Sequence, residues 1–145
     1  MITFKKGSIF KCGARVLVNP VNTVGVMGAG LAKIFKEKYP EMFADYRRTC
    51  IAGVLEPGTL HLWRGKDVVV VNLPTKTTWM EPSQYEYVDL GLQSLAEFLK
   101  GEGRVKVAIP ALGCGLGGLE WNKVKDLIKA NLGKSKADIL VFEPH

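Results

Sequence analysis

Two nearly continuous apolar runs constrain the fold of this chain more than any other feature of its sequence. Val68 to Pro74 reads Val-Val-Val-Val-Asn-Leu-Pro, and Val105 to Ala111 reads Val-Lys-Val-Ala-Ile-Pro-Ala. A strand with one face in water alternates apolar and polar residues, whereas strands buried on both faces read as unbroken apolar runs. We therefore expect a sheet covered on both faces.

Short apolar runs and helical patterns alternate along the chain, which is typical of a three-layer α/β/α domain. We expect a single domain over residues 1–145, with a central six-stranded mixed sheet. The expected strands are Ile2–Phe4, Arg15–Asn19, Thr59–Trp63, Val68–Leu73, Val105–Ile109 and Ile139–Phe142. The expected helices, which carry apolar stripes at helical spacing, are Gly30–Lys38, Pro40–Ile51, Ser83–Lys100 and Glu120–Leu132. Because Val-Phe-Glu-Pro-His closes the last strand, we expect the domain to be complete.

Composition excludes several classes of protein. The net charge of +6, from 20 Lys plus Arg against 14 Asp plus Glu, suits an anionic partner. Three scattered cysteines and two histidines give too few well-spaced ligands for zinc, so we expect no metal and no cofactor. The odd number of thiols and the lack of a signal peptide indicate a cytoplasmic protein. No apolar run approaches the ~20 residues that span a bilayer, so we expect no membrane contact.

Three loops follow strands that read as buried, and ligands of open α/β sheets bind beyond the carboxyl ends of such strands. The loops are residues 19–30, 74–82 and 110–118. The first ends in Gly-Ala-Gly at a helix start, and the third contains four glycines. Glycines let the backbone approach a ligand, and helix N-termini favour anions. The pair predicts a diphosphate-binding site, although the same glycines could simply form tight turns. Neither loop has the spacing of a P-loop or a dinucleotide fingerprint.

Four side chains in or beside these loops have two readings each. Asn22 either caps its turn, as loop asparagines often do, or hydrogen-bonds a ribose. Lys76 follows a strand between the two glycine-rich loops, so it is either an ordinary solvated lysine or a reactive amine. Trp79 and Tyr85 either pack at the rim or stack on a base.

Three strings together resemble the macrodomains, the ADP-ribose-binding α/β/α modules. They are Asn-Pro-Val-Asn-Thr-Val-Gly-Val-Met-Gly-Ala-Gly-Leu-Ala-Lys-Ile-Phe, Leu-Pro-Thr-Lys-Thr-Thr-Trp with the following Glu-Pro-Ser-Gln-Tyr, and Ile-Pro-Ala-Leu-Gly-Cys-Gly-Leu-Gly-Gly-Leu-Glu-Trp. They occur in the family's order over essentially the whole chain. The likeness is greatest to the DarG antitoxin group, within the branch shared with terminal ADP-ribose glycohydrolases.

This resemblance implies a DNA ADP-ribosyl glycohydrolase, an antitoxin that repairs single-stranded DNA modified by a DarT-type toxin, which is a possible protein partner. It implies a monomer that binds ADP-ribose, with Lys76 matching the catalytic lysine and Asn22 the asparagine at the distal ribose. The ADP-ribose-binding residues expected are Ser8, Ile9, Asn19, Asn22, Gly28, Ala29, Gly30, Leu31, Thr75, Pro110, Leu112, Gly113, Cys114, Gly115, Leu116, Gly117, Gly118 and Leu119.

Two positions depart from wider family patterns. Many macrodomains have Gly-Asp followed by Ile or Leu where this chain has Gly7-Ser8-Ile9, so the contact to the adenine amino group is weakened or made by backbone. The branch that acts on protein esters has an acid where this chain has Gly117. The absence of a Lys–Asp pair favours a nucleobase substrate over a modified protein.

No carboxylate pair marks the loops, so a glycosidase mechanism with two acids is not expected. Lys76 either donates a proton or hydrogen bond to the departing base, or its amine attacks the opened sugar and forms a Schiff base. The alternatives in function are a non-catalytic ADP-ribose reader, a phosphatase of ADP-ribose 1″-phosphate and a deacetylase of O-acetyl-ADP-ribose. A β-branched residue at Gly115 or Gly117 is expected to block the diphosphate while leaving the fold largely intact.

Overall fold

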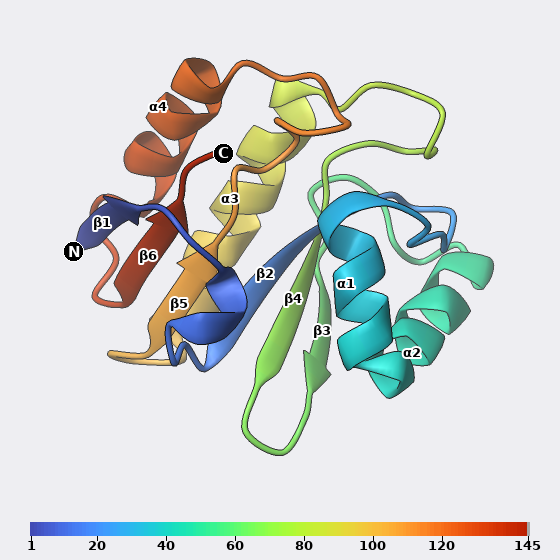
Figure 1. Ribbon diagram of the computed structural model, residues 1–145, viewed down its shortest axis with the longest axis horizontal. Coiled ribbons are helices and arrows are strands. Elements are labelled where there is room, and N and C mark those ends of the chain that lie inside the picture. The colour runs from blue at the N-terminus through green and yellow to red at the C-terminus, as the bar shows by residue number, and fades with distance from the viewer. Residues whose placement is uncertain (145) are drawn as a thin grey trace.

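The structure, a computed structural model, describes residues 1–144 and is built around one six-stranded sheet (Figure 1). The strands lie in the order β1-β6-β5-β2-β4-β3, and only β3 is antiparallel to its neighbour, which confirms the predicted mixed sheet. Their bounds are β1 Ile2–Lys5, β2 Val16–Val21, β3 His61–Arg64, β4 Val69–Pro74, β5 Lys106–Ile109 and β6 Asp138–Phe142. His145, at the end of the expected domain, lies outside the described residues.

Helices cover both faces of this sheet, so the predicted three-layer α/β/α architecture is confirmed. The helices are α1 Gly30–Lys38, α2 Pro40–Ile51, α3 Tyr85–Lys100 and α4 Trp121–Leu132, with a short 3₁₀ turn at Ile9–Lys11. One core lies between the sheet and α3 with α4, and includes Leu92, Leu95 and Ile128, all fully buried. The other lies under α1 and α2, around Phe35 and Tyr46. Alternate residues of β2 and β4 enter the two cores, which explains their continuous apolar sequences.

The expected elements are all present, with small shifts at their ends. The most informative shift is in β2, which continues beyond the expected Asn19 through Pro20 to Val21. Proline lacks the N–H that a central strand needs. However, β2 pairs with β5 only at Val16 and Leu17, so the strand has one free edge at Pro20. The third helix begins at Tyr85 instead of the expected Ser83, whose N–H donates to the Gly117 carbonyl.

The topology places the three glycine-rich or lysine-bearing loops next to one another. β5, β2 and β4 are adjacent and parallel, so their carboxyl ends lie at the same end of the sheet. The loop after β4 projects beyond that end, close to the start of α1 (Figure 1). This is the position at which α/β sheets bind ligands.

Within residues 1–144, no group of three or more His, Cys, Asp and Glu side chains is arranged to hold a metal ion. No helix there is both long enough and apolar enough to cross a membrane.

Candidate functional site

Backbone hydrogen bonds tie the three loops together. The Thr75 N–H donates to the Val21 carbonyl at 2.9 Å, and the Thr23 N–H donates to the Thr77 carbonyl at 3.0 Å, which joins the loops after β2 and β4. The Ser83 N–H donates to the Gly117 carbonyl at 3.0 Å, which joins the loops after β4 and β5. The three loops therefore form one continuous wall at the end of the sheet.

A cleft of about 810 Å³ opens between these loops. It is large enough for a dinucleotide-sized ligand, since small-molecule sites usually measure ~300–1,000 Å³. It brings together most of the residues predicted from the sequence. Those that line it are Ser8, Ile9, Gly30, Leu31, Thr75, Lys76, Pro110, Gly113, Cys114, Gly115, Leu116 and Gly117.

The start of α1 supplies free backbone donors to the cleft. Gly30, Leu31 and Ala32 line it, and the first hydrogen bond of the helix runs from the Lys33 N–H to the Ala29 carbonyl at 3.3 Å. The N–H groups before Lys33 have no partner within the helix. Ala29 offers no side-chain cap, and the first turn contains no acid. This helix end therefore favours an anionic ligand in the cleft.

The loop after β5 needs two of its glycines for steric reasons. Gly113 has φ of +72°, and a Cβ there would lie 2.7 Å from Leu119 Cδ1. A Cβ at Gly117 would lie 2.5 Å from the Gly113 carbonyl oxygen and would overlap the Ser83 hydroxyl. At Gly115, by contrast, a Cβ would meet no atom within 4 Å. The expectation that a β-branched residue at Gly117 leaves the fold largely intact is therefore wrong, whereas at Gly115 the space is open.

Lys76 is half-buried in the wall of the cleft, immediately after the buried Thr75. Within residues 1–144, no hydrogen bond or ion pair involves its amine. The Thr75 hydroxyl pairs with the Ser83 hydroxyl at 3.0 Å, and both side chains are buried. The backbone beneath Lys76 is thus fixed while its amine stays available to a ligand.

Several predicted residues lie near the cleft but do not line it. Gly28 and Ala29 are exposed just before α1, Leu112 is fully buried in the core, and Gly118 and Leu119 complete the turn before α4. Leu119 packs against Gly113, so it supports the cleft from behind.

Asn22 shapes its own loop. Its side-chain oxygen accepts from the N–H groups of Val24, Gly25 and Val26 at 3.1–3.3 Å, and its amide donates to the Val26 carbonyl at 2.8 Å. The Tyr46 hydroxyl also bonds to it, at 2.8 Å. Asn22 therefore caps its own turn, which is one of the two roles considered for it, and a contact from Asn22 to a ribose stays a prediction.

Asn19 belongs to a buried polar row that crosses three strands. Its amide donates to Asn72 Oδ1 at 3.0 Å, and the Asn72 amide donates to His61 Nδ1 at 2.9 Å. His61 Nε2 then pairs with Asp45 of α2 at 2.8 Å. Asn19 is fully buried, so it underlies the site without lining the cleft.

Burial sets the chemistry of the one cysteine in the cleft. Burial raises the pKa of the Cys114 thiol to about 11. Its Sγ lies 3.5 Å from the Leu112 carbonyl oxygen. At neutral pH this side chain is therefore a neutral thiol, which suits packing against a ligand and not nucleophilic attack.

The cleft also contains residues that the sequence did not single out. Ser83 lines it because its loop folds back against Gly117. Phe10, Phe142 and Glu143 form the end away from Lys76, with Gly7, Pro20, Ala32, Ile34, Ala111 and Pro144 completing the wall. An aromatic residue closing the last strand was visible in the sequence, but the pairing of β1 with β6 is what brings it to the same cleft as Phe10.

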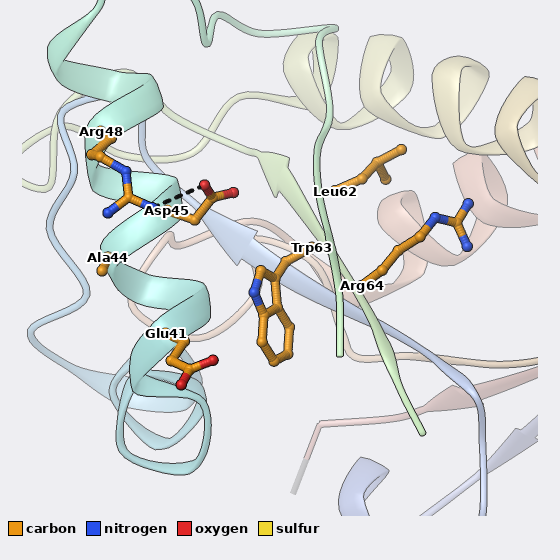
Figure 2. A pocket seen from close by; sticks show the side chains of 7 residues that line it. All are labelled: Glu41, Ala44, Asp45, Arg48, Leu62, Trp63 and Arg64. Carbon is orange, nitrogen blue, oxygen red and sulfur yellow. Dashed lines mark hydrogen bonds and ion pairs between the residues drawn. The ribbon is translucent and has the colours of Figure 1, made fainter. Parts of the chain in front are cut away.

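A second, more open depression lies between α2 and β3 and measures about 630 Å³ (Figure 2). Asp45 and Arg48 pair across 3.2 Å on its helical side, and Trp63 forms part of the opposite side. None of the residues predicted for ADP-ribose lines it, so the cleft at the end of the sheet is the candidate site.

The fold and the cleft define an α/β/α ligand-binding module. The Macro domain family model matches residues 18–128, and the chain belongs to this family. Among its relatives is the Thermus aquaticus protein named DNA ADP-ribosyl glycohydrolase, which is 38% identical over 99% of this chain. The chain spans about two fifths of the length of the relatives that carry this name, 41–42%.

Solved structures of macrodomain proteins are also similar to this chain. The macrodomain of Mycobacterium tuberculosis DarG has a TM-score of 0.94 and 35% identity, over 100% of this chain and 99% of that one. Thermosipho africanus DarTG in complex with ADP-ribose has a TM-score of 0.92 and 33% identity, over 99% of this chain and 41% of that one.

Proposed function

We propose that this protein is a DNA ADP-ribosyl glycohydrolase, which binds ADP-ribose in the cleft and removes it from modified bases of single-stranded DNA. The observation that carries the proposal is the free amine of Lys76 in the wall of a cleft bounded by an uncapped helix start. The DarG relatives and the ADP-ribose complex of Thermosipho africanus DarTG support the choice of ligand.

The binding groups are assigned from their chemistry. The free N–H groups at the start of α1 and the open backbone around Gly115 would hold the diphosphate. The aromatic end, at Phe10 and Phe142, would take the adenine. With the diphosphate and the adenine held at these two places, the distal ribose and its attached base would lie towards Lys76. This placement would orient the bond to be broken.

The reaction breaks the C–N bond between ribose and base, and water supplies the hydroxyl that ends on the sugar carbon and the proton that ends on the base. The two roles considered for Lys76 remain. Its ammonium would donate to the departing base, or its neutral amine would attack the opened sugar to form a Schiff base that water resolves. In both, Thr75 and Ser83 would hold the strand end from which Lys76 extends.

The crowding at Gly117 supports a nucleobase as the substrate in place of a protein ester. A carboxylate side chain at this position would overlap Ser83 and approach the Gly113 carbonyl, so this loop has no room for an acid at position 117.

We also propose that the protein is a cytoplasmic antitoxin. It would act as a monomer with a single macrodomain and counteract a DarT-type DNA ADP-ribosyltransferase.

The proposal is tested by incubating the protein with single-stranded oligonucleotides that carry ADP-ribose on one defined base each, and weighing the products. We expect one modified base to lose the mass of ADP-ribose. Release from an acylated ADP-ribose or from ADP-ribose 1″-phosphate, with none from DNA, would identify the alternative esterase or phosphatase. Binding without release from any substrate would identify a reader.

A further inference from the structure

The loop after β4 presents an exposed tryptophan beside the cleft. Its base is closed by a hydrogen bond from the Gln84 N–H to the Thr75 carbonyl, at 2.9 Å. Lys76 and Ser83, towards its two ends, line the cleft. Between them, Trp79 is 59% exposed. A large ring this open to water contributes little to the core, and such surfaces commonly mark binding sites.

The loop after β2, which is joined to the loop after β4, also exposes apolar side chains. Both the N–H and the hydroxyl of Thr23 bond to the Thr77 carbonyl at 3.0 Å, which joins the two loops. Val24 and Val26, which follow Thr23, are 47% and 39% exposed. Met80, which follows Trp79, is 73% exposed.

A cation borders the same surface. Arg47 of α2 is exposed and packs against the loop after β2, since a Cβ at Gly25 would lie 3.3 Å from Arg47 Cγ. Within residues 1–144, no ion pair involves Arg47, whereas the next residue, Arg48, pairs with Asp45 at 3.2 Å. The acid of the loop after β4, Glu81, accepts a hydrogen bond from the Thr77 hydroxyl at 2.9 Å.

We infer that this rim, formed by Val24, Val26, Arg47, Trp79 and Met80, binds the unpaired nucleotides next to the modified base, an inference that rests on the proposed function. An exposed indole stacks on a base of any sequence, and an unpaired arginine contacts a phosphate without reading sequence. The net charge of +6 complements such a strand. The preferred partner is single-stranded, because bases paired in a duplex cannot turn their faces to Trp79.

Binding of an unmodified oligonucleotide of about ten nucleotides tests the rim without any catalysis. With fluorescence anisotropy, we expect Trp79→Ala to weaken binding about tenfold and Trp79→Phe to retain most of it. Arg47→Ala is expected to weaken binding and to lower the slope of log Kd against log salt by about one. Arg104→Ala is the matched control, because this exposed arginine precedes β5 at the opposite end of the parallel strands.

Hydrolysis separates the rim from the cleft. Trp79→Ala should raise KM for a modified oligonucleotide about tenfold. KM for the modified mononucleoside and the affinity for ADP-ribose should stay unchanged. If Trp79→Ala and Arg47→Ala bind oligonucleotides and release ADP-ribose from them as the wild type does, the rim serves another partner, such as a protein, and the inference fails. Tighter binding to a duplex than to a single strand would also overturn it.

The two proposals fail in different ways. A protein that binds unmodified oligonucleotides through Trp79 but releases no ADP-ribose would refute the proposed function and leave the rim as a strand-binding surface. A protein that releases ADP-ribose from DNA with Trp79→Ala unaltered would refute only the rim.

Discussion

Gly117 and Ser83 show how a single contact between two residues decides the chemistry of the cleft. Ser83 donates its N–H to the Gly117 carbonyl, and its hydroxyl occupies the space into which any side chain at position 117 would extend. The loops after β4 and β5 are therefore held together by a pair that tolerates only glycine on one side. This packing leaves no room for a carboxylate side chain at position 117.

The two glycines tested at this loop should behave differently. Gly115→Val should abolish ADP-ribose binding and leave the unfolding temperature near that of the wild type, since its Cβ meets no protein atom within 4 Å. Gly117→Val should destabilise the protein by about 1–3 kcal/mol, because it overpacks a buried position. Calorimetric titration and thermal unfolding give both quantities. Undiminished ADP-ribose binding by Gly115→Val would remove this loop from the binding site.

Cys114 should be slow to react. With burial raising its pKa to about 11, only about one thiol in ten thousand is ionised at pH 7. Alkylation by iodoacetamide, followed by mass with Cys114→Ser as the reference, should accelerate about tenfold per pH unit in the alkaline range. ADP-ribose should protect the residue, which lines the cleft. Rapid alkylation at neutral pH would contradict this account of its surroundings.

At the scale of elements, a polar row holds β2, β4, β3 and α2 in register beneath the site. Asn19, Asn72 and His61 occupy paired positions on three neighbouring strands, and Asp45 extends the row to α2. Each buried amide or ring nitrogen in the row depends on the next for a hydrogen bond. The row therefore ties α2 to the three strands beneath it.

Removing the middle of this row should be costly. Asn72→Ala leaves His61 Nδ1 without a partner and the Asn19 amide with only the weak contact to Met27 Sδ at 3.8 Å, so we expect a loss of about 1–3 kcal/mol in the free energy of unfolding. Urea titration measures it. Gln93→Ala is the control, because its bond to Asp89 is exposed and should be worth less than about 0.5 kcal/mol. Equal effects of the two substitutions would show that the row contributes little to stability.

The outer end of the row should make stability depend on pH. The hydrogen bond from His61 is the main cause that lowers the pKa of Asp45. A carboxyl with a lowered pKa stabilises the fold fully above its unfolded value of about 4, and this stabilisation is lost as the pH falls through the folded value. Urea unfolding from about pH 6 to about pH 3 should show a steeper decline for the wild type than for Asp45→Asn. Parallel curves would mean that the pair contributes no pH dependence.

At the scale of the whole molecule, the sequence predicted the architecture well because burial on both faces leaves a direct mark. The unbroken runs of β4 and β5 report the two cores, and the glycine-rich strings lie at the ends of adjacent strands. Contacts made by folding left no such mark. Ser83 looked like the start of a helix, and Asn19 was expected to bind ADP-ribose, whereas it lies fully buried in the polar row. Phe10 and Phe142, far apart in the sequence, line the same cleft because the first and last strands pair.

The proposed function requires Lys76 to perform chemistry in a cleft that binds ADP-ribose through other residues. Lys76→Ala should keep its affinity for ADP-ribose within a few fold and lose about 10²–10⁴ in kcat, because the lost contact acts in the transition state. Lys76→Arg separates charge and hydrogen-bond donation, which arginine retains, from Schiff-base formation and proton transfer, which it does not support. Substantial activity in this variant would favour electrostatic support.

The most direct measurement is the single-turnover rate of ADP-ribose release from a modified single-stranded oligonucleotide, compared between wild type and Lys76→Ala at saturating protein. We expect release by the wild type and almost none by the variant, although the variant should still bind ADP-ribose in calorimetry. Release by Lys76→Ala at a rate near that of the wild type would contradict this expectation, and Lys76 would then be an ordinary lysine in the wall of a binding cleft.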